Sequence, residues 1–73
     1  MTKTLTAILE REGDGFVALC PELDIASQGS TLEEAKAKLR EAVELFFECA
    51  GEKETAGRLG GEIYVTQFEV ELA

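Results

Sequence analysis

The chain has 73 residues, of which 15 are acidic and 7 basic, and its net charge is −8 with no histidine. A chain of this length forms one small domain that buries only about 60% of its unfolded surface, so we expect oligomerisation to supply further stability. The negative charge disfavours direct binding to nucleic-acid phosphates, and it suits either a basic protein partner or solubility alone.

The first part of the sequence predicts a hairpin and a third short strand. Residues 4–10 and 16–20 are apolar runs, and residues 12–15 between them read Glu-Gly-Asp-Gly, which is typical of a tight turn. Pro21 ends the second strand because it has no N–H to donate. Residues 25–28 are expected to form the third strand.

The middle of the sequence predicts one amphipathic helix over residues 31–50, with apolar residues at steps of three and four. Its start reads as a capping box: the Ser30 hydroxyl accepts from the Glu33 N–H, and the Glu33 carboxylate accepts from the Ser30 N–H. We therefore predict Ser30 as the N-cap residue and Glu33 as its structural partner.

The last part predicts a polar, glycine-containing loop at residues 52–61 and a final strand at residues 62–72. Alternation along that strand places its apolar side chains mainly on one face. The expected fold class is therefore α+β: an antiparallel sheet of three to four strands in the order β-β-β-α-β, with one helix packed on one face.

The second strand is apolar on both of its faces, and one helix can cover only one of them. We therefore expect a homodimer or a higher homo-oligomer. No apolar run approaches the roughly 20 residues of a membrane helix, and no signal peptide follows Met1, so the expected location is cytoplasmic without membrane contact. The absence of asparagine favours a thermophilic source.

The sequence offers no recognisable catalytic, cofactor or metal site. Cys20 and Cys49 have no histidine to pair with, and the first strand carries no acid before Glu10. We expect no enzymatic activity, no cofactor and no metal. A residual metal-dependent nuclease is the catalytic alternative.

The order and spacing of several short motifs resemble the HicB-like antitoxin family, over about the first two-thirds of the chain. The motifs are Asp14-Gly15-Phe16, Pro21-Glu22-Leu23, Ser27-Gln28-Gly29, Thr31-Leu32-Glu33-Glu34-Ala35 and Glu41-Ala42. This resemblance implies a degenerate ribonuclease H-like fold. It also implies the short form of the family, with one domain over residues 1–73 and no separate DNA-binding domain.

The resemblance further implies that the chain neutralises a basic, mRNA-cleaving HicA-like toxin by binding it and occluding its RNA site. The alternative is a stand-alone homo-oligomeric binding domain with an unknown ligand and no toxin. For a partner interface we single out the loop after the second strand, with Glu22 and Asp24 as presented charges and Leu23 as an apolar anchor. An equally open interpretation is that Leu23 only fills the edge of the sheet. The acidic end of the last strand, at Glu69 and Glu71, is the alternative interface.

Overall fold

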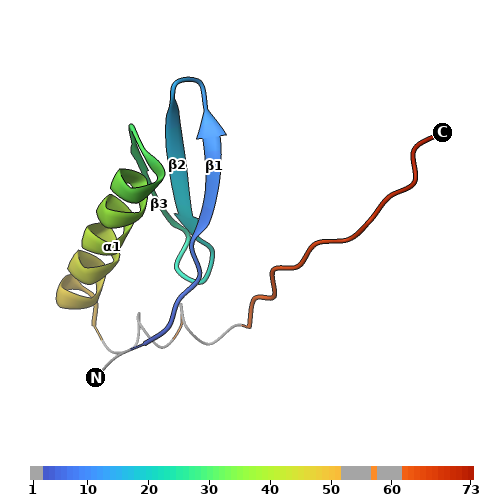
Figure 1. Cartoon of the computed structure of the whole chain (residues 1–73). Coiled ribbons are helices and arrows are strands. Elements are labelled where there is room, and N and C mark those ends of the chain that lie inside the picture. Colours follow the sequence, from blue (N-terminus) through green and yellow to red (C-terminus); the bar gives the residue numbers. More distant parts are fainter. Residues whose placement is uncertain (1–2, 52–56, 58–61) are drawn as a thin grey trace.

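The computed structural model describes residues 3–51, 57 and 62–73. Within them, three antiparallel strands, β1 (Ile8–Glu12), β2 (Gly15–Cys20) and β3 (Ile25–Gly29), precede one helix, α1 (Leu32–Cys49) (Figure 1). The strands lie in the sheet in chain order, and the helix packs on one face. The predicted α+β class, with one helix on one face of an antiparallel sheet, is confirmed.

A two-residue turn joins the first two strands. Gly13 has a φ of 59°, a left-handed conformation that glycine adopts without strain and that suits the twist of a tight hairpin. The ladder then runs from the pair Glu12 and Gly15 to the pair Ile8 and Leu19. Strand β1 begins four residues later than predicted, because β2 ends just before Pro21 and leaves the preceding residues of the first strand little to pair with.

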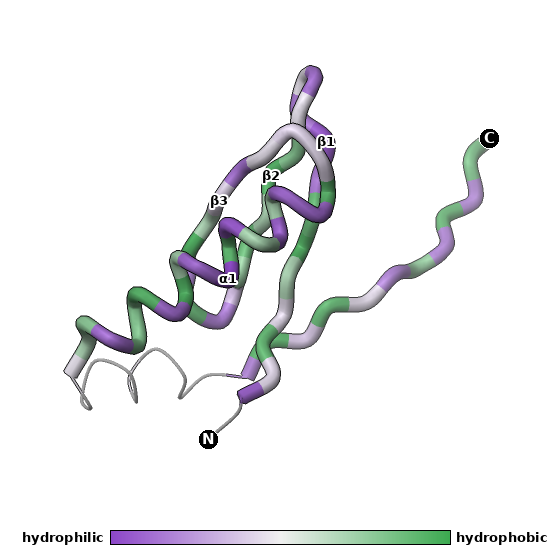
Figure 2. Tube along the Cα trace, turned by 60° about the vertical axis from the view of Figure 1, so that its left-hand side comes forward, coloured by the Kyte–Doolittle hydropathy of each residue, from purple (hydrophilic) through white to green (hydrophobic). Residues whose placement is uncertain are grey.

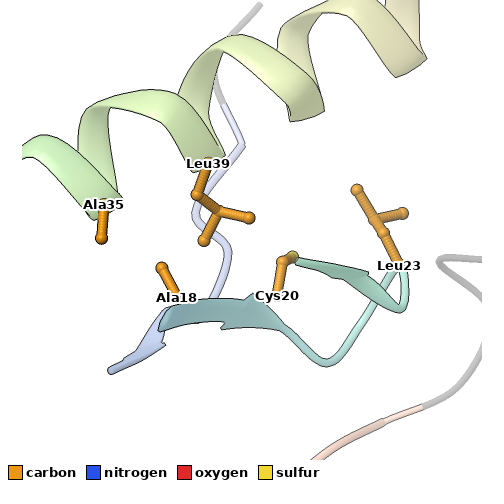
Figure 3. Packing of buried hydrophobic residues seen from close by; sticks show 5 residues of the cluster. All are labelled: Ala18, Cys20, Leu23, Ala35 and Leu39. Atoms are coloured by element: carbon orange, nitrogen blue, oxygen red, sulfur yellow. The ribbon is translucent and has the colours of Figure 1, made fainter. Parts of the chain in front are cut away.

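The core lies between the helix and the inner face of the sheet. Ala35 and Leu39 of the helix point toward Ala18 and Cys20 of β2, while Leu23 closes the end of the cluster from the loop (Figure 3). All five side chains are buried. The core is small, which agrees with the marginal stability expected from the length of the chain.

Strand β3 approaches the start of the helix very closely at Gly29. A Cβ atom built on Gly29 would lie 2.6 Å from the backbone nitrogen of Ala35, far closer than atoms tolerate. Glycine therefore allows the chain to turn directly from β3 into α1 and sets how near the helix lies to the sheet.

Residues 62–73 form a segment that we call the C-terminal arm, and they do not form the fourth strand that was predicted at residues 62–72. The arm is extended and leads away from the sheet, and none of its described residues belongs to a strand (Figure 1). The physical reason is that no neighbouring strand of this single chain lies beside it to provide a ladder. The predicted loop at residues 52–61 falls, apart from Gly57, outside the described residues.

Candidate partner-binding surfaces

The loop after β2, which we singled out as a partner interface, places Glu22, Leu23 and Asp24 in three different environments. Leu23 is completely buried, and its backbone N–H donates to the Cys20 carbonyl at 3.3 Å. Its burial agrees with the interpretation in which Leu23 fills the edge of the sheet. Asp24 is exposed and has a φ of 55°, so it stands at the tip of a tight turn. A role of this loop in partner binding stays a prediction.

Glu22 is held by the chain segment that leads into β1. Its two carboxylate oxygens accept from the Thr6 backbone N–H at 3.1 and 3.0 Å, and one of them also accepts from the Thr6 hydroxyl at 2.7 Å. These bonds join residues 16 positions apart, and they fix the N-terminal segment against the loop. Glu22 therefore already has a structural role and is less available to a partner than Asp24.

The surroundings of Glu22 affect two titrating groups. Burial raises the pKa of this carboxyl, but hydrogen bonds from Thr6, from the Glu22 backbone and from Cys20 together outweigh it, so the pKa of Glu22 lies below its ordinary 4.5. Burial raises the pKa of the Cys20 thiol, and the Glu22 carboxylate raises it further. A hydrogen bond with the Leu23 backbone lowers this pKa but does not cancel the increase. Cys20 donates to Glu22 at 3.6 Å as a neutral thiol.

The helix cap differs by one residue from the prediction. Thr31 is the N-cap residue, and its hydroxyl accepts from the Glu34 N–H at 3.0 Å. The Glu34 carboxylate accepts from the Ser30 N–H at 3.2 Å and lies 3.5 Å from the Lys38 ammonium. The prediction of Ser30 and Glu33 as the capping pair is therefore wrong. Thr31 and Glu34 have the same three-residue spacing as the predicted pair.

The sheet face away from the helix carries one apolar row, next to a row in which Glu10 and Gln28 flank Val17. Residues directly opposite each other in an antiparallel ladder share a face, so the pairs Ile8–Leu19 and Leu19–Ala26 form an apolar row across all three strands. Val17 lies on the same side and is only half-buried. Within the described residues, no other element lies over this row. The expectation that a second copy or another partner covers this face stays a prediction.

The C-terminal arm is the second uncovered apolar surface. Hydrophobic and hydrophilic residues alternate along it (Figure 2). Phe68 is 84% exposed and Leu72 is 90% exposed. The alternative acidic interface, Glu69 and Glu71, lies on this arm and is also exposed.

The hydrogen bonds between Thr6 and Glu22 were not predicted, and no local pattern points to them, because they form only when two distant segments meet. Within the described ranges 3–51 and 62–73, no three cysteine or carboxylate side chains gather as metal ligands would. No helix among the described residues has the length and apolarity needed to cross a membrane.

Comparison with known proteins finds one clear similarity. The chain is 48% identical over 50 residues to UPF0150 protein ssl0738 of Synechocystis sp., a match that covers 66% of this chain and 69% of that protein. No protein-family model matches the chain. No solved structure matches it significantly.

Proposed function

The chain belongs to the UPF0150 family, and we propose that within it this protein is a HicB-like, antitoxin-type interaction domain that binds a basic HicA-like toxin and occludes its RNA-cleaving site. The observation that carries the proposal is the acidic balance of 15 acidic to 7 basic residues on a chain without histidine. Such a surface attracts a basic ribonuclease and competes with RNA for it. The HicB-like order of motifs supports the same assignment.

The proposed interaction uses both charge and apolar contact. Exposed acids steer a basic partner, while an apolar surface is needed to hold it. The row through Ile8, Leu19 and Ala26 is one such surface, and Asp24 is an exposed acid at the end of the sheet where β2 and β3 join. We further propose that the chain acts as a homodimer or higher homo-oligomer, without direct nucleic-acid binding and without catalysis of its own.

The test is inhibition of a purified HicA-like ribonuclease that cleaves a labelled RNA. Adding the chain should abolish cleavage near a stoichiometric ratio. Full cleavage in the presence of excess folded chain would contradict the proposal. Cleavage of RNA by the chain alone, lost when a single acid is mutated, would instead support the nuclease alternative.

A pair of matched variants tests where the toxin is steered. Asp24→Asn and Asp14→Asn make the same chemical change at exposed turns on opposite ends of the sheet. Asparagine also tolerates the positive φ at position 24, so the fold is retained. Asp24→Asn should slow association about two- to threefold and reduce its salt dependence, and Asp14→Asn should do so less. Equal effects would remove the loop after β2 from the interface.

A further inference from the structure

The C-terminal arm has the sequence of a strand but no strand beside it. One side of its alternation is almost wholly apolar, and the other side begins apolar and becomes acidic. The described arm makes hydrogen bonds only between near neighbours, from the Tyr64 hydroxyl to Glu62 at 2.6 Å and from the Thr66 hydroxyl to the Gln67 carbonyl at 3.4 Å. The apolar side carries Tyr64, Phe68, Val70 and Leu72, each exposed.

Strand β1 lies at an edge of the sheet, where another strand can be added. In the order β1-β2-β3, strand β1 has a neighbour on one side only, so its outer edge presents backbone groups that no described strand pairs. The helix packs chiefly over β3 and β2, and it touches β1 little. Leu5, Ala7 and Leu9, on the inner side of this edge, are therefore only partly buried.

The two incomplete surfaces complement each other. A strand added beside β1 with its apolar side toward the helix would place Phe68 and Val70 next to the half-covered Leu9, and would extend the core. The same placement turns Glu69 and Glu71 outward to water. The added ladder would also pair the edge backbone that one copy of the chain leaves open.

Within one copy, the arm leads away from β1 (Figure 1). The radius of gyration is 14.5 Å, against about 11 Å for a compact chain of this length. Two copies related by a twofold axis can exchange arms, so that both edges and both arms are paired at once and the assembly closes.

We propose that residues 62–72 add as a fourth strand to the β1 edge of a second copy of this chain, with Phe68 and Val70 completing the partner's core. This inference rests on the homo-oligomer part of the proposed function and not on toxin binding.

The test combines a matched pair of variants with a measurement of which chain each arm contacts. Phe68→Lys and Gln67→Lys introduce a lysine at adjacent positions, on the apolar side and on the opposite side of the arm. Phe68→Lys should weaken the dimer about 100-fold in sedimentation equilibrium, because a large apolar side chain loses its buried site. Gln67→Lys should change the dissociation constant by less than about threefold, since that side chain faces water.

The contact measurement uses wild-type dimers assembled from one isotope-labelled and one unlabelled copy. Nuclear Overhauser contacts between the arm of one copy and β1 of the other are the expected result, and unchanged helix circular dichroism in Phe68→Lys confirms that the domain still folds. Arm contacts confined to the same copy would overturn the exchange. If both lysine variants leave the dimer intact, the copies join through another surface and the proposal is wrong. A wild-type chain that is monomeric at tens of micromolar would contradict both this proposal and the proposed oligomer.

Discussion

The folded region at residues 3–51 and the C-terminal arm at residues 62–73 have similarly apolar sequences but opposite environments. In the folded region, Ala18 and Leu39 are almost fully buried between sheet and helix, whereas Phe68 and Leu72 in the arm are more than four-fifths exposed. The difference lies in the neighbours. An alternating pattern indicates that one side of a strand will be covered, and it does not say which segment will cover it.

Hydrogen bonds show the same contrast. In the folded region, Glu22 bonds Thr6 across 16 positions and ties two segments together. In the arm, the hydrogen bond from Tyr64 to Glu62 spans only two positions and does not join distant segments of the chain. Long-range bonds of the first kind define tertiary structure, and the arm can acquire them only from another strand.

The largest expected effect separates a core leucine from an arm leucine. Leu39→Ala should lower the free energy of unfolding by about 2–5 kcal/mol, a large part of the stability of so small a domain. Leu72→Ala should lower it by less than about 0.5 kcal/mol in urea denaturation at concentrations where the chain is monomeric. Similar losses for both variants would mean that the arm packs within its own copy.

The next effect tests the Glu22 contacts and their pH dependence. Glu22→Gln should cost about 1 kcal/mol at neutral pH, since the charge-assisted hydrogen bonds to Thr6 are weakened. Glu62→Gln makes the same change in the arm and should leave the free energy of unfolding unchanged.

The lowered pKa of Glu22 fixes the sign of the acid response. Its ionised form stabilises the fold fully above the ordinary value of 4.5, and this contribution is lost as the pH falls through the lower folded-state pKa. Denaturation is measured at a series of acid pH values. Below the folded-state pKa of Glu22, the free energy of unfolding of the wild type should approach that of Glu22→Gln. A constant gap between the two proteins would disprove the linkage.

The smallest effect concerns the helix start. Thr31→Ala removes the N-cap acceptor and should cost about 1 kcal/mol, and Ser30→Ala should cost less than about 0.5 kcal/mol. Thermal denaturation of the two variants compares them under the same conditions. The reverse order of stabilities would restore the capping pair predicted from the sequence.

Much of the folded region could be predicted because its signals are local. The turn glycines, Pro21 and the helical spacing of Ala35 and Leu39 each act within a few residues, and the structure places all three features as expected. The cap was ambiguous because Ser30 and Thr31 each precede a glutamate by three positions, so the spacing alone does not distinguish them.

The remaining features depend on distant or external partners, which local patterns do not contain. The hydrogen bonds from Thr6 to Glu22 arise from the tertiary fold. They show that an acidic residue in a loop can have a structural role instead of being available to a partner. The arm carries a strand pattern without a partner in its own copy. The partner surfaces singled out in the loop and at Glu69 and Glu71 stay predictions for the same reason.

The most direct test of strand exchange is amide hydrogen exchange of the arm, measured across the concentration range in which the dimer dissociates. Backbone amides of residues 62–72 should be protected in proportion to the fraction of dimer and should lose protection on dilution, while β2 amides stay protected in the folded monomer. Arm amides that exchange at unstructured rates in the dimer, or that remain protected in the isolated monomer, would contradict strand exchange between copies.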